Sequence, residues 1–266
     1  MLKENQKKIE IHIDCDNGWV YANDLNEPKF YNISIYENSI SKFMEILEEY
    51  KIKGVFFVVG KDLKNDPKAK TILKKAIAAG HSIGNHTYEH SINYSKLSHT
   101  ETVNEVQKNH CVIIDELNIH PKHFRAPGYI KNKKVLEALN YLGYEFESST
   151  YPGLYPKILN LYFTIIRSSK RINSKNRYME FKELKIQKIA TSTVFKIPMH
   201  STILCMLPKS ISTKLLQKIN FASDCYLFHG IDLVHKFPDS SKHPMSKLSF
   251  ESRVQIVRKI IGSINV

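Results

Sequence analysis

Two histidines and two aspartates have the residue types and spacing that a metal site needs. His86 and His90 are four residues apart, and on a helical turn this spacing places both imidazoles on one face, about 6 Å apart. Asp14 and Asp16 end the first apolar run, and a carboxylate is the usual third ligand beside two histidines. The four residues predict a site where one aspartate binds a divalent metal. The other accepts a proton from water, whose pKa falls toward about 7 on such a metal.

Each half of this pattern also has an ordinary explanation. A histidine pair at this spacing arises by chance about as readily as it binds a metal, and Asp14-Cys15-Asp16 alone is typical of a turn rich in Asx residues. The run from His86 to His90 lacks the glutamate position of the HExxH motif, which excludes the zincin mechanism. The metal interpretation therefore depends on the whole set.

Arg125 and His229 have the chemistry that would complete such a site. Arg125 precedes Pro127 and Gly128, and its planar guanidinium can hold both oxygens of a carboxylate and orient a base. His229 ends a late apolar run, and an imidazole there can protonate a leaving amine as a general acid. Taken alone, each is better explained as a surface or packed residue, so these assignments depend on the aspartates and histidines.

Strands and helices alternate along the chain. Turn residues at 16–18 predict a loop after the first strand, where barrel enzymes place catalytic groups. The predicted strands are 9–14, 55–59, 81–83, 144–147 and 225–228, and the predicted helices are 39–50, 67–79, 100–117, 133–142 and 249–261. This alternation predicts a parallel sheet, and the number of repeats favours a barrel. The 266 residues fit a single catalytic domain, with an insertion at about 151–208 that breaks the rhythm.

Composition limits the class of protein. Four scattered cysteines form no CxxC pair, so neither a zinc knuckle nor a redox motif is indicated. The net charge of +13 comes mainly from dispersed lysines without a nucleic-acid-reading motif, so we expect no nucleic acid partner. The polar start lacks the apolar core of a signal peptide and no apolar run could span a membrane. We expect a cytoplasmic protein, with peripheral contact at the inner face of the membrane as an option.

Five segments in chain order resemble the polysaccharide deacetylase family, carbohydrate esterase family 4, also known as the nodulation-protein-type deacetylase homology domain. They are Asp14/Asp16, GVFFVVG at 54–60, GHSIGNHTYEH at 80–90, RAPGY at 125–129 and LFH at 227–229. The resemblance covers residues 9 to about 149 well and 226–229 more weakly. It implies a distorted, incomplete (β/α) barrel with a divalent metal, usually zinc, although cobalt or another ion is compatible.

The resemblance also implies a role for each matching residue. Asp16, His86 and His90 would be the metal ligands. Asp14 would be the general base, Arg125 would orient it, and His229 would be the general acid. Backbone N–H groups near Gly128 and Tyr129 would stabilise the oxyanion together with the metal.

The chain departs from the family pattern at three places. Cys15 separates two aspartates that are adjacent in many members, and this Asp-x-Asp form resembles a branch with intracellular deacylases, cyclic-amide hydrolases and deformylases. Glu147 stands where relatives often have aspartate before serine, so it receives no role. The third departure is the insertion, whose apolar run 158–166 is followed by basic residues, a composition suited to an anionic membrane and equally to a helical cap on the barrel.

The leading function is metal-dependent removal of an N-acetyl or N-formyl group from an aminosugar, in a bacterial cell-surface glycan or a lipid-linked sugar pathway. The first rival is hydrolysis of a small non-sugar amide such as a cyclic ureide, which the same groups could perform. The second is a catalytically silent relative that binds glycans or anionic membranes.

Overall fold

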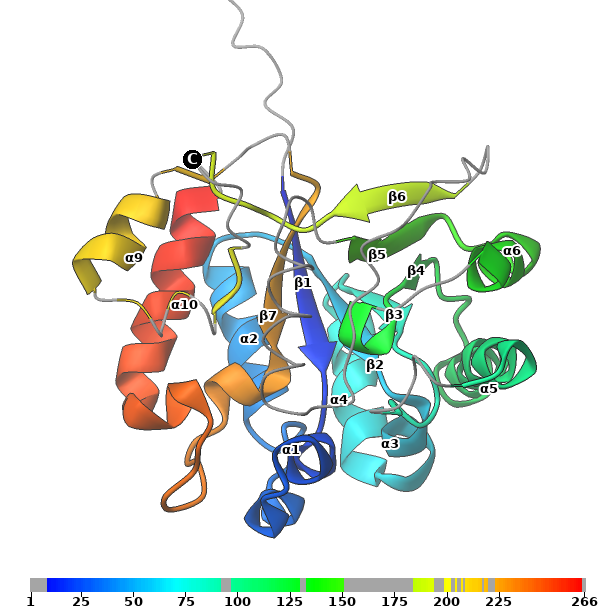
Figure 1. Ribbon diagram of the computed structural model, residues 1–266, viewed down its shortest axis with the longest axis horizontal. Coiled ribbons are helices and arrows are strands. Elements are labelled where there is room, and N and C mark those ends of the chain that lie inside the picture. The colour runs from blue at the N-terminus through cyan, green and yellow to red at the C-terminus, as the bar shows by residue number, and fades with distance from the viewer. Residues whose placement is uncertain are drawn as a thin grey trace, which may run out of the picture.

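The strands form one curled parallel sheet (Figure 1). The computed structural model describes residues 9–91, 97–129, 133–150, 184–193, 199–201, 204, 207, 209–216, 218–219 and 223–264. Within these residues the sheet has seven strands in the order β6-β5-β4-β3-β2-β1-β7. They are β1 (Glu10–Cys15), β2 (Gly54–Val58), β3 (Ser82–Asn85), β4 (His123–Phe124), β5 (Phe146–Thr150), β6 (Lys185–Lys188) and β7 (Cys225–His229).

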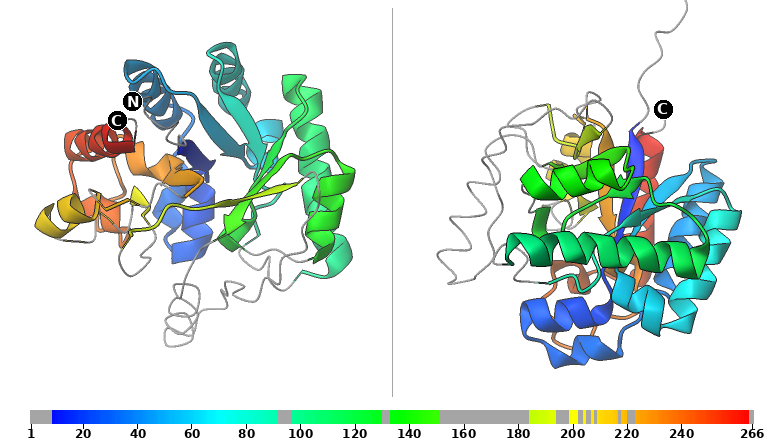
Figure 2. Two further views of the ribbon diagram at one scale, coloured as in Figure 1. Left: turned by 90° about the horizontal axis from the view of Figure 1, so that it is seen from above. Right: turned by 90° about the vertical axis from the view of Figure 1, so that its right-hand side faces the viewer.

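Helices cover the outer face of the curled sheet, as the views in Figures 1 and 2 show for α4, α5 and α10. The helices are α1 (Gly18–Leu25), α2 (Ser39–Glu49), α3 (Gly60–Asn65), α4 (Pro67–Ala78), α5 (His99–Leu117), α6 (Lys133–Tyr141), α9 (Lys209–Leu216) and α10 (Phe250–Ile264). Short 3-10 turns are η1 (Pro28–Asn32), η3 (Pro127–Tyr129), η4 (Gly230–Leu233) and η5 (Pro244–Lys247). The main apolar core lies between helices and strands, because the outward-facing Ile11, Ile13 and Phe56 are fully buried in it.

Local sequence explains where several helices begin. Asp66 caps α4 by accepting a hydrogen bond from the Lys68 N–H, and Pro67 occupies the first helical position, where its missing N–H costs nothing. Ser98 and Glu101 form a reciprocal capping box at the start of α5. These signals account for the good agreement between the predicted and observed bounds of both helices.

The two edges of the sheet meet at one end. The N–H of Ala190, just past β6, donates to the Cys225 carbonyl at the start of β7 over 2.7 Å, and the Asp224 N–H donates to the Lys188 carbonyl over 3.0 Å. The described residues of β6 and β7 make no continuous ladder with each other. The sheet is therefore a curled, incompletely closed barrel, which confirms the predicted fold class.

Sequence analysis missed several elements. The predicted loop at 16–18 leads directly into α1, because the Asn17 side chain accepts from the Gly18 N–H and starts a helix. Helix α3 was also not predicted. Strand β6 lies within the predicted insertion at about 151–208, and α9 begins directly after it; neither element was predicted. The apolar-then-basic run 158–177 lies outside the described residues, and among the described helices none is long and apolar enough to cross a membrane.

Candidate active site

Strand register brings the predicted base and acid to adjacent strands. On β1, Asp14 is paired with His229 of β7 on one side and with Phe57 of β2 on the other. All three strands run parallel, so their carboxyl ends lie at the same edge of the barrel. Asp16 follows β1 at this edge, and His86 follows β3. Residues separated by more than 200 positions in sequence thereby meet at one place.

Asp16, His86 and His90 form a compact group of potential metal ligands. Asp16 Oδ1 lies 3.2 Å from Nε2 of His86 and 3.2 Å from Nε2 of His90. One ligand atom from each residue lies within 4.8 Å of the other two, and all three side chains are buried. Two ligands at about 2.1 Å from a tetrahedral zinc are separated by about 3.4 Å. The spacing therefore fits a small divalent ion.

The surroundings of the three side chains support the same conclusion. Asp16 Oδ1 is buried and has no hydrogen-bond partner among the described residues other than these two imidazoles. The His86 Nδ1 lies 2.7 Å from the Arg125 carbonyl. A carbonyl can only accept, so this contact places the proton on Nδ1 and leaves the Nε2 lone pair directed at Asp16. The donor set fits a metal such as zinc.

The charges of the group also suit a cation. Burial alone would raise the pKa of Asp16, but the two neighbouring imidazoles bring this pKa well below its usual range. Burial lowers the pKa of His90 despite the nearby Asp16 carboxylate. Burial also acts to lower the pKa of His86, but Asp14 and Asp16 outweigh it and raise that pKa. A deprotonated carboxylate thus lies between two imidazoles, and among the described residues no lysine or arginine forms an ion pair with it.

The prediction that His86 and His90 share a helical turn is wrong. Strand β3 ends at Asn85, and the next residues form a loop in which Thr87 and His90 have φ values of 64° and 43°. The side chain of Asn85 holds this loop by accepting from the Thr87 N–H over 2.8 Å. The N–H of Gly60 donates to the Thr87 carbonyl over 3.0 Å. The imidazoles converge because the loop folds back, with ring centroids 4.8 Å apart.

Asp14 is held by Arg125. The Arg125 Nε lies 3.1 Å from Asp14 Oδ1, and both side chains are almost completely buried. Asp14 Oδ2 lies 3.9 Å from His86 Nε2, which places the carboxylate beside the three ligands. The Arg125 guanidinium also lies over the Phe57 ring, with Cζ 4.7 Å from its centroid. Arg125 is thus a buried cation paired with Asp14, next to the three candidate metal ligands.

His229 is partly exposed at the end of β7 and is supported from behind by Asp232. The His229 N–H donates to Asp232 Oδ2 over 2.9 Å, and the Ser201 hydroxyl donates to the same oxygen. His229 Nδ1 is buried and has no hydrogen-bond partner among the described residues. This nitrogen is therefore not already engaged by another described residue. Asp232 was not singled out from the sequence, although its position three residues after His229 matches a capping residue.

Gly128 and Tyr129 lie in η3, next to the Arg125 segment. Both have positive φ values, 57° and 61°. The Tyr129 N–H already donates to the Ala126 carbonyl over 3.0 Å, so it would have to be shared to bind an oxyanion. The turn is held by Ser149, whose hydroxyl accepts from the Ala126 N–H, and buried Glu147 accepts from the Ser149 N–H. Glu147 therefore has a structural contact near the site.

A surface hollow of about 440 Å³ opens beside His90. Its lining includes Trp19, Tyr31, Lys61 and Glu89. Lys61 pairs with Glu89 over 2.9 Å and lies 5.1 Å from the centroid of the Trp19 ring. The hollow combines aromatic surface with polar groups, which is the composition of many small-ligand sites.

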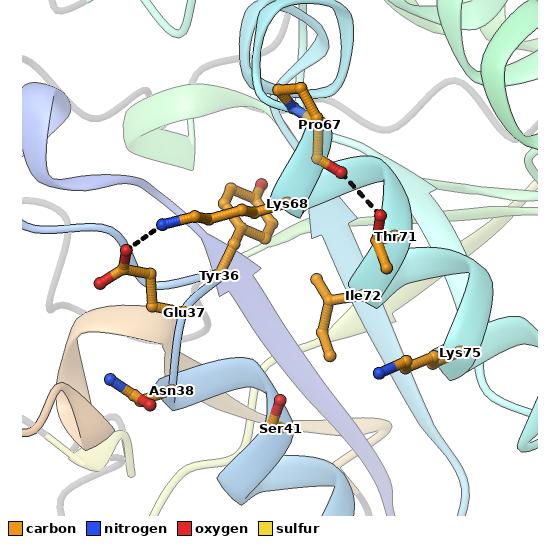
Figure 3. A pocket seen from close by; sticks show the side chains of 9 residues that line it. All are labelled: Tyr36, Glu37, Asn38, Ser41, Pro67, Lys68, Thr71, Ile72 and Lys75. Carbon is orange, nitrogen blue, oxygen red and sulfur yellow. Dashed lines mark hydrogen bonds and ion pairs between the residues drawn. The ribbon is translucent and has the colours of Figure 1, made fainter.

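Another hollow, between α2 and α4, contains none of the predicted site residues. Figure 3 shows the Lys68 ammonium directed at the Glu37 carboxylate, and the Thr71 hydroxyl donating to the Pro67 carbonyl over 2.9 Å. Its most prominent polar groups are thus paired with each other. We assign it no chemistry.

Two interior residues near the site were not predicted. His12 and Phe57 pack against each other with ring centroids 5.0 Å apart, and both contact Arg125. The Phe57 ring fits here because Gly84 has no side chain: a Cβ at position 84 would lie only 2.6 Å from the ring. His12 could have been found from the sequence, because residues two apart on a strand face the same side and His12 precedes Asp14 by two.

The fold and the site together define an incomplete α/β barrel with a candidate metal centre at the carboxyl ends of its strands. Residues 3–146, more than half of the chain, match the polysaccharide deacetylase family model, and the chain belongs to this family. It is 28% identical over 140 residues to the uncharacterized protein YlxY of Bacillus subtilis, covering 51% of this chain and 43% of that protein. It is 27% identical over 147 residues to the peptidoglycan-N-acetylmuramic acid deacetylase PdaA of the same species, covering 53% and 46%. The match thus spans less than half the length of either relative.

Solved structures show the same fold. A family 4 carbohydrate esterase from Streptomyces lividans has a TM-score of 0.51 at 10% identity, with 97% of this chain and 90% of that chain covered. The Bacillus anthracis protein BA3943, described as a pseudoenzyme of the same family, has a TM-score of 0.53 at 14% identity, with 97% and 62% covered. Since the fold occurs with and without activity, function must be argued from the site residues.

Proposed function

We propose that this protein is a metal-dependent deacylase that removes an N-acetyl or N-formyl group from an aminosugar. The main observation behind this proposal is that Asp16, His86 and His90 converge on one point. A separate carboxylate, Asp14, lies beside them and forms an ion pair with Arg125. Membership of the polysaccharide deacetylase family supports the reaction class. PdaA, a deacetylase of a peptidoglycan aminosugar, supports the substrate class.

In this proposal the divalent cation, most simply zinc, is held by Asp16, His86 and His90. When bound it lowers the pKa of a water molecule and polarises the acyl carbonyl. Asp14 accepts the proton from the attacking water, and Arg125 keeps its carboxylate oriented for that transfer. The N–H of Gly128 adds hydrogen bonding to the developing oxyanion.

His229 donates a proton to the departing amine. Its place opposite Asp14 in the β1–β7 register sets the acid and the base on neighbouring strands, at the same edge of the barrel. Two titratable groups on either side of a scissile amide allow one proton to be removed from the nucleophile and another delivered to the leaving group. The products are a free amine and a carboxylate.

The test is release of amine from acetylated and formylated aminosugars by chelator-stripped protein, with and without added zinc or cobalt. Free and polymeric sugars should be included, together with a cyclic ureide. Metal-restored turnover of an acylated sugar, lost in Asp14→Asn, is the expected result. Turnover of the ureide alone would show that the substrate is a small amide and not an aminosugar. No turnover of any substrate, despite stoichiometric metal binding, would favour a catalytically silent glycan- or membrane-binding protein.

A lipid-linked aminosugar, acted on at the inner face of an anionic membrane, is the finer form of the proposal. Its support is the net charge of +13 and the apolar-then-basic run 158–177. Sedimentation with vesicles that contain anionic lipid, at low and high salt, tests it. Binding that disappears at high salt is expected. If the protein does not bind these vesicles at low salt, the proposal of membrane contact is wrong. A water-soluble aminosugar would then remain the proposed substrate.

A further inference from the structure

The inward face of β1 carries a row of polar side chains. Glu10, His12 and Asp14 alternate with Ile11 and Ile13, and in an extended strand such alternate residues face the same side. The two isoleucines belong to the main apolar core outside the sheet. The polar residues therefore point into the barrel, where His12 is fully buried.

His12 contacts the arginine that holds the proposed base. The Arg125 Nη2 lies 2.6 Å from His12 Nδ1, whereas the Arg125 Nε lies 3.1 Å from Asp14 Oδ1. An arginine can only donate, so His12 Nδ1 must be the acceptor and the imidazole proton must be on Nε2. The contacts of the guanidinium thus include a carboxylate on one nitrogen and an imidazole on another.

The other side of the imidazole explains why this tautomer is stable. His12 Nε2 lies 3.1 Å from Glu10 Oε2 and donates a hydrogen bond to it, and the Gln187 amide of β6 donates to the same oxygen over 2.7 Å. Burial lowers the pKa of His12 to about 3, with Glu10 opposing this effect and Arg125 adding to it. The ring is neutral at ordinary pH and remains able to accept from Arg125.

We propose that His12 is a positioning residue for the deacylation site, holding the Arg125 guanidinium in the orientation that aligns Asp14. The expected effect of His12 on kcat rests on the proposed function. The expected effect of His12 on the orientation of Arg125 does not. The competing explanation is that His12 only satisfies buried polar groups. In that case its loss would lower stability without changing the Arg125 orientation or the catalytic step.

The experiment compares His12→Leu, which removes the acceptor, with His12→Asn, whose amide oxygen can replace it. The matched control is His123→Leu. His123 is also buried in the barrel, with its ring centroid 6.2 Å from that of His12, and it stacks on Phe146. Neither ring nitrogen of His123 has a hydrogen-bond partner among the described residues, although its Nε2 lies 3.9 Å from Glu10 Oε2. Each zinc-loaded protein is assayed for metal content, kcat and KM on the best acylated aminosugar.

The expected result is a fall in kcat of about 10- to 100-fold for His12→Leu, the range seen when groups that orient active-site residues are removed. KM and bound metal should change little, and His12→Asn should recover most of the lost kcat. His123→Leu should lose stability but keep kcat. Unchanged kcat in His12→Leu, or equal losses in His12→Leu, His12→Asn and His123→Leu, would overturn the proposal.

A second measurement makes the outcome independent of activity. The Nε–H resonance of Arg125 in ¹⁵N-labelled protein, assigned by its loss in Arg125→Lys, reports the contact with Asp14. It should shift in His12→Leu, return in His12→Asn and stay in place in His123→Leu. If wild type turns over no acylated sugar but the resonance follows this pattern, the proposed function fails and the positioning role stands. An unmoved resonance in His12→Leu would refute the positioning role whatever the activity.

Discussion

The buried pair Asp14–Arg125 should be strongly coupled, and a double-mutant cycle can measure this. Arg125→Met leaves the Asp14 carboxylate buried without its cation, and Asp14→Asn leaves the cation without its carboxylate. Removing one partner of a buried pair typically costs about 3–5 kcal/mol. With the facing atoms 3.1 Å apart, the Coulomb energy at an effective dielectric constant of about 20 is about 5 kcal/mol. We therefore expect a coupling energy of about 2–5 kcal/mol, so that the double variant costs less than the sum of the two single ones by that amount.

Urea unfolding of the chelator-stripped proteins is the appropriate assay, because urea does not screen charges and bound metal would mask the pair. The single tryptophan of the sequence, Trp19, reports unfolding by its fluorescence, since its Nε1–H donates to buried Asp62 over 2.7 Å. The exposed pair Arg258–Glu49, at 2.5 Å, is the matched control and should show much weaker coupling. Additive effects of Asp14→Asn and Arg125→Met, within about 0.5 kcal/mol, would refute the conclusion that Arg125 holds Asp14.

Three further predictions follow from the described geometry. Asp16→Ala should lose stoichiometric zinc in equilibrium dialysis while Asp14→Asn keeps it, and equal loss in both would contradict the division of roles. The free energy of unfolding should fall as the pH drops from about 6.5 toward 3, by on the order of a few kcal/mol from His12 alone. This is because the unfolded chain protonates that histidine near its usual pKa of 6.5 whereas the folded chain does so only at about 3. If the free energy of unfolding depends on pH no more steeply in the wild type than in His12→Asn, then His12 does not cause this loss of stability. Gly84→Ala should lower the melting temperature by several degrees, since the added Cβ would lie 2.6 Å from the Phe57 ring, and an unchanged melting temperature would show that the ring can move.

Local sequence determined much of the architecture and the membership of the candidate site. The alternation of strands and helices follows from apolar periodicity and caps, which act between near neighbours, so the bounds of α4 and α5 were predicted within a few residues. The choice of Asp16, His86 and His90 as metal ligands was implied by the resemblance of the combined motifs to the family, and the structure brings these residues together.

Only the tertiary structure decided how these residues meet. The His86–His90 spacing suggested a helical turn, but the left-handed residues Thr87 and His90 form a loop instead, held by Asn85 and by N–H groups of α3. Such a loop depends on contacts between distant segments, which periodicity does not encode.

The contacts inside the barrel were the part of the structure that the sequence predicted least. The sequence placed His12 two residues before Asp14, on the same face of a strand, but it contained no sign that Arg125, 113 residues later, would lie 2.6 Å away. The pairing of Asp14 with His229 likewise required β7 to pack beside β1. The residue types and their order thus indicated the chemistry, whereas distances, tautomers and buried charge pairs arose only when the sheet curled and brought the carboxyl ends of its strands together.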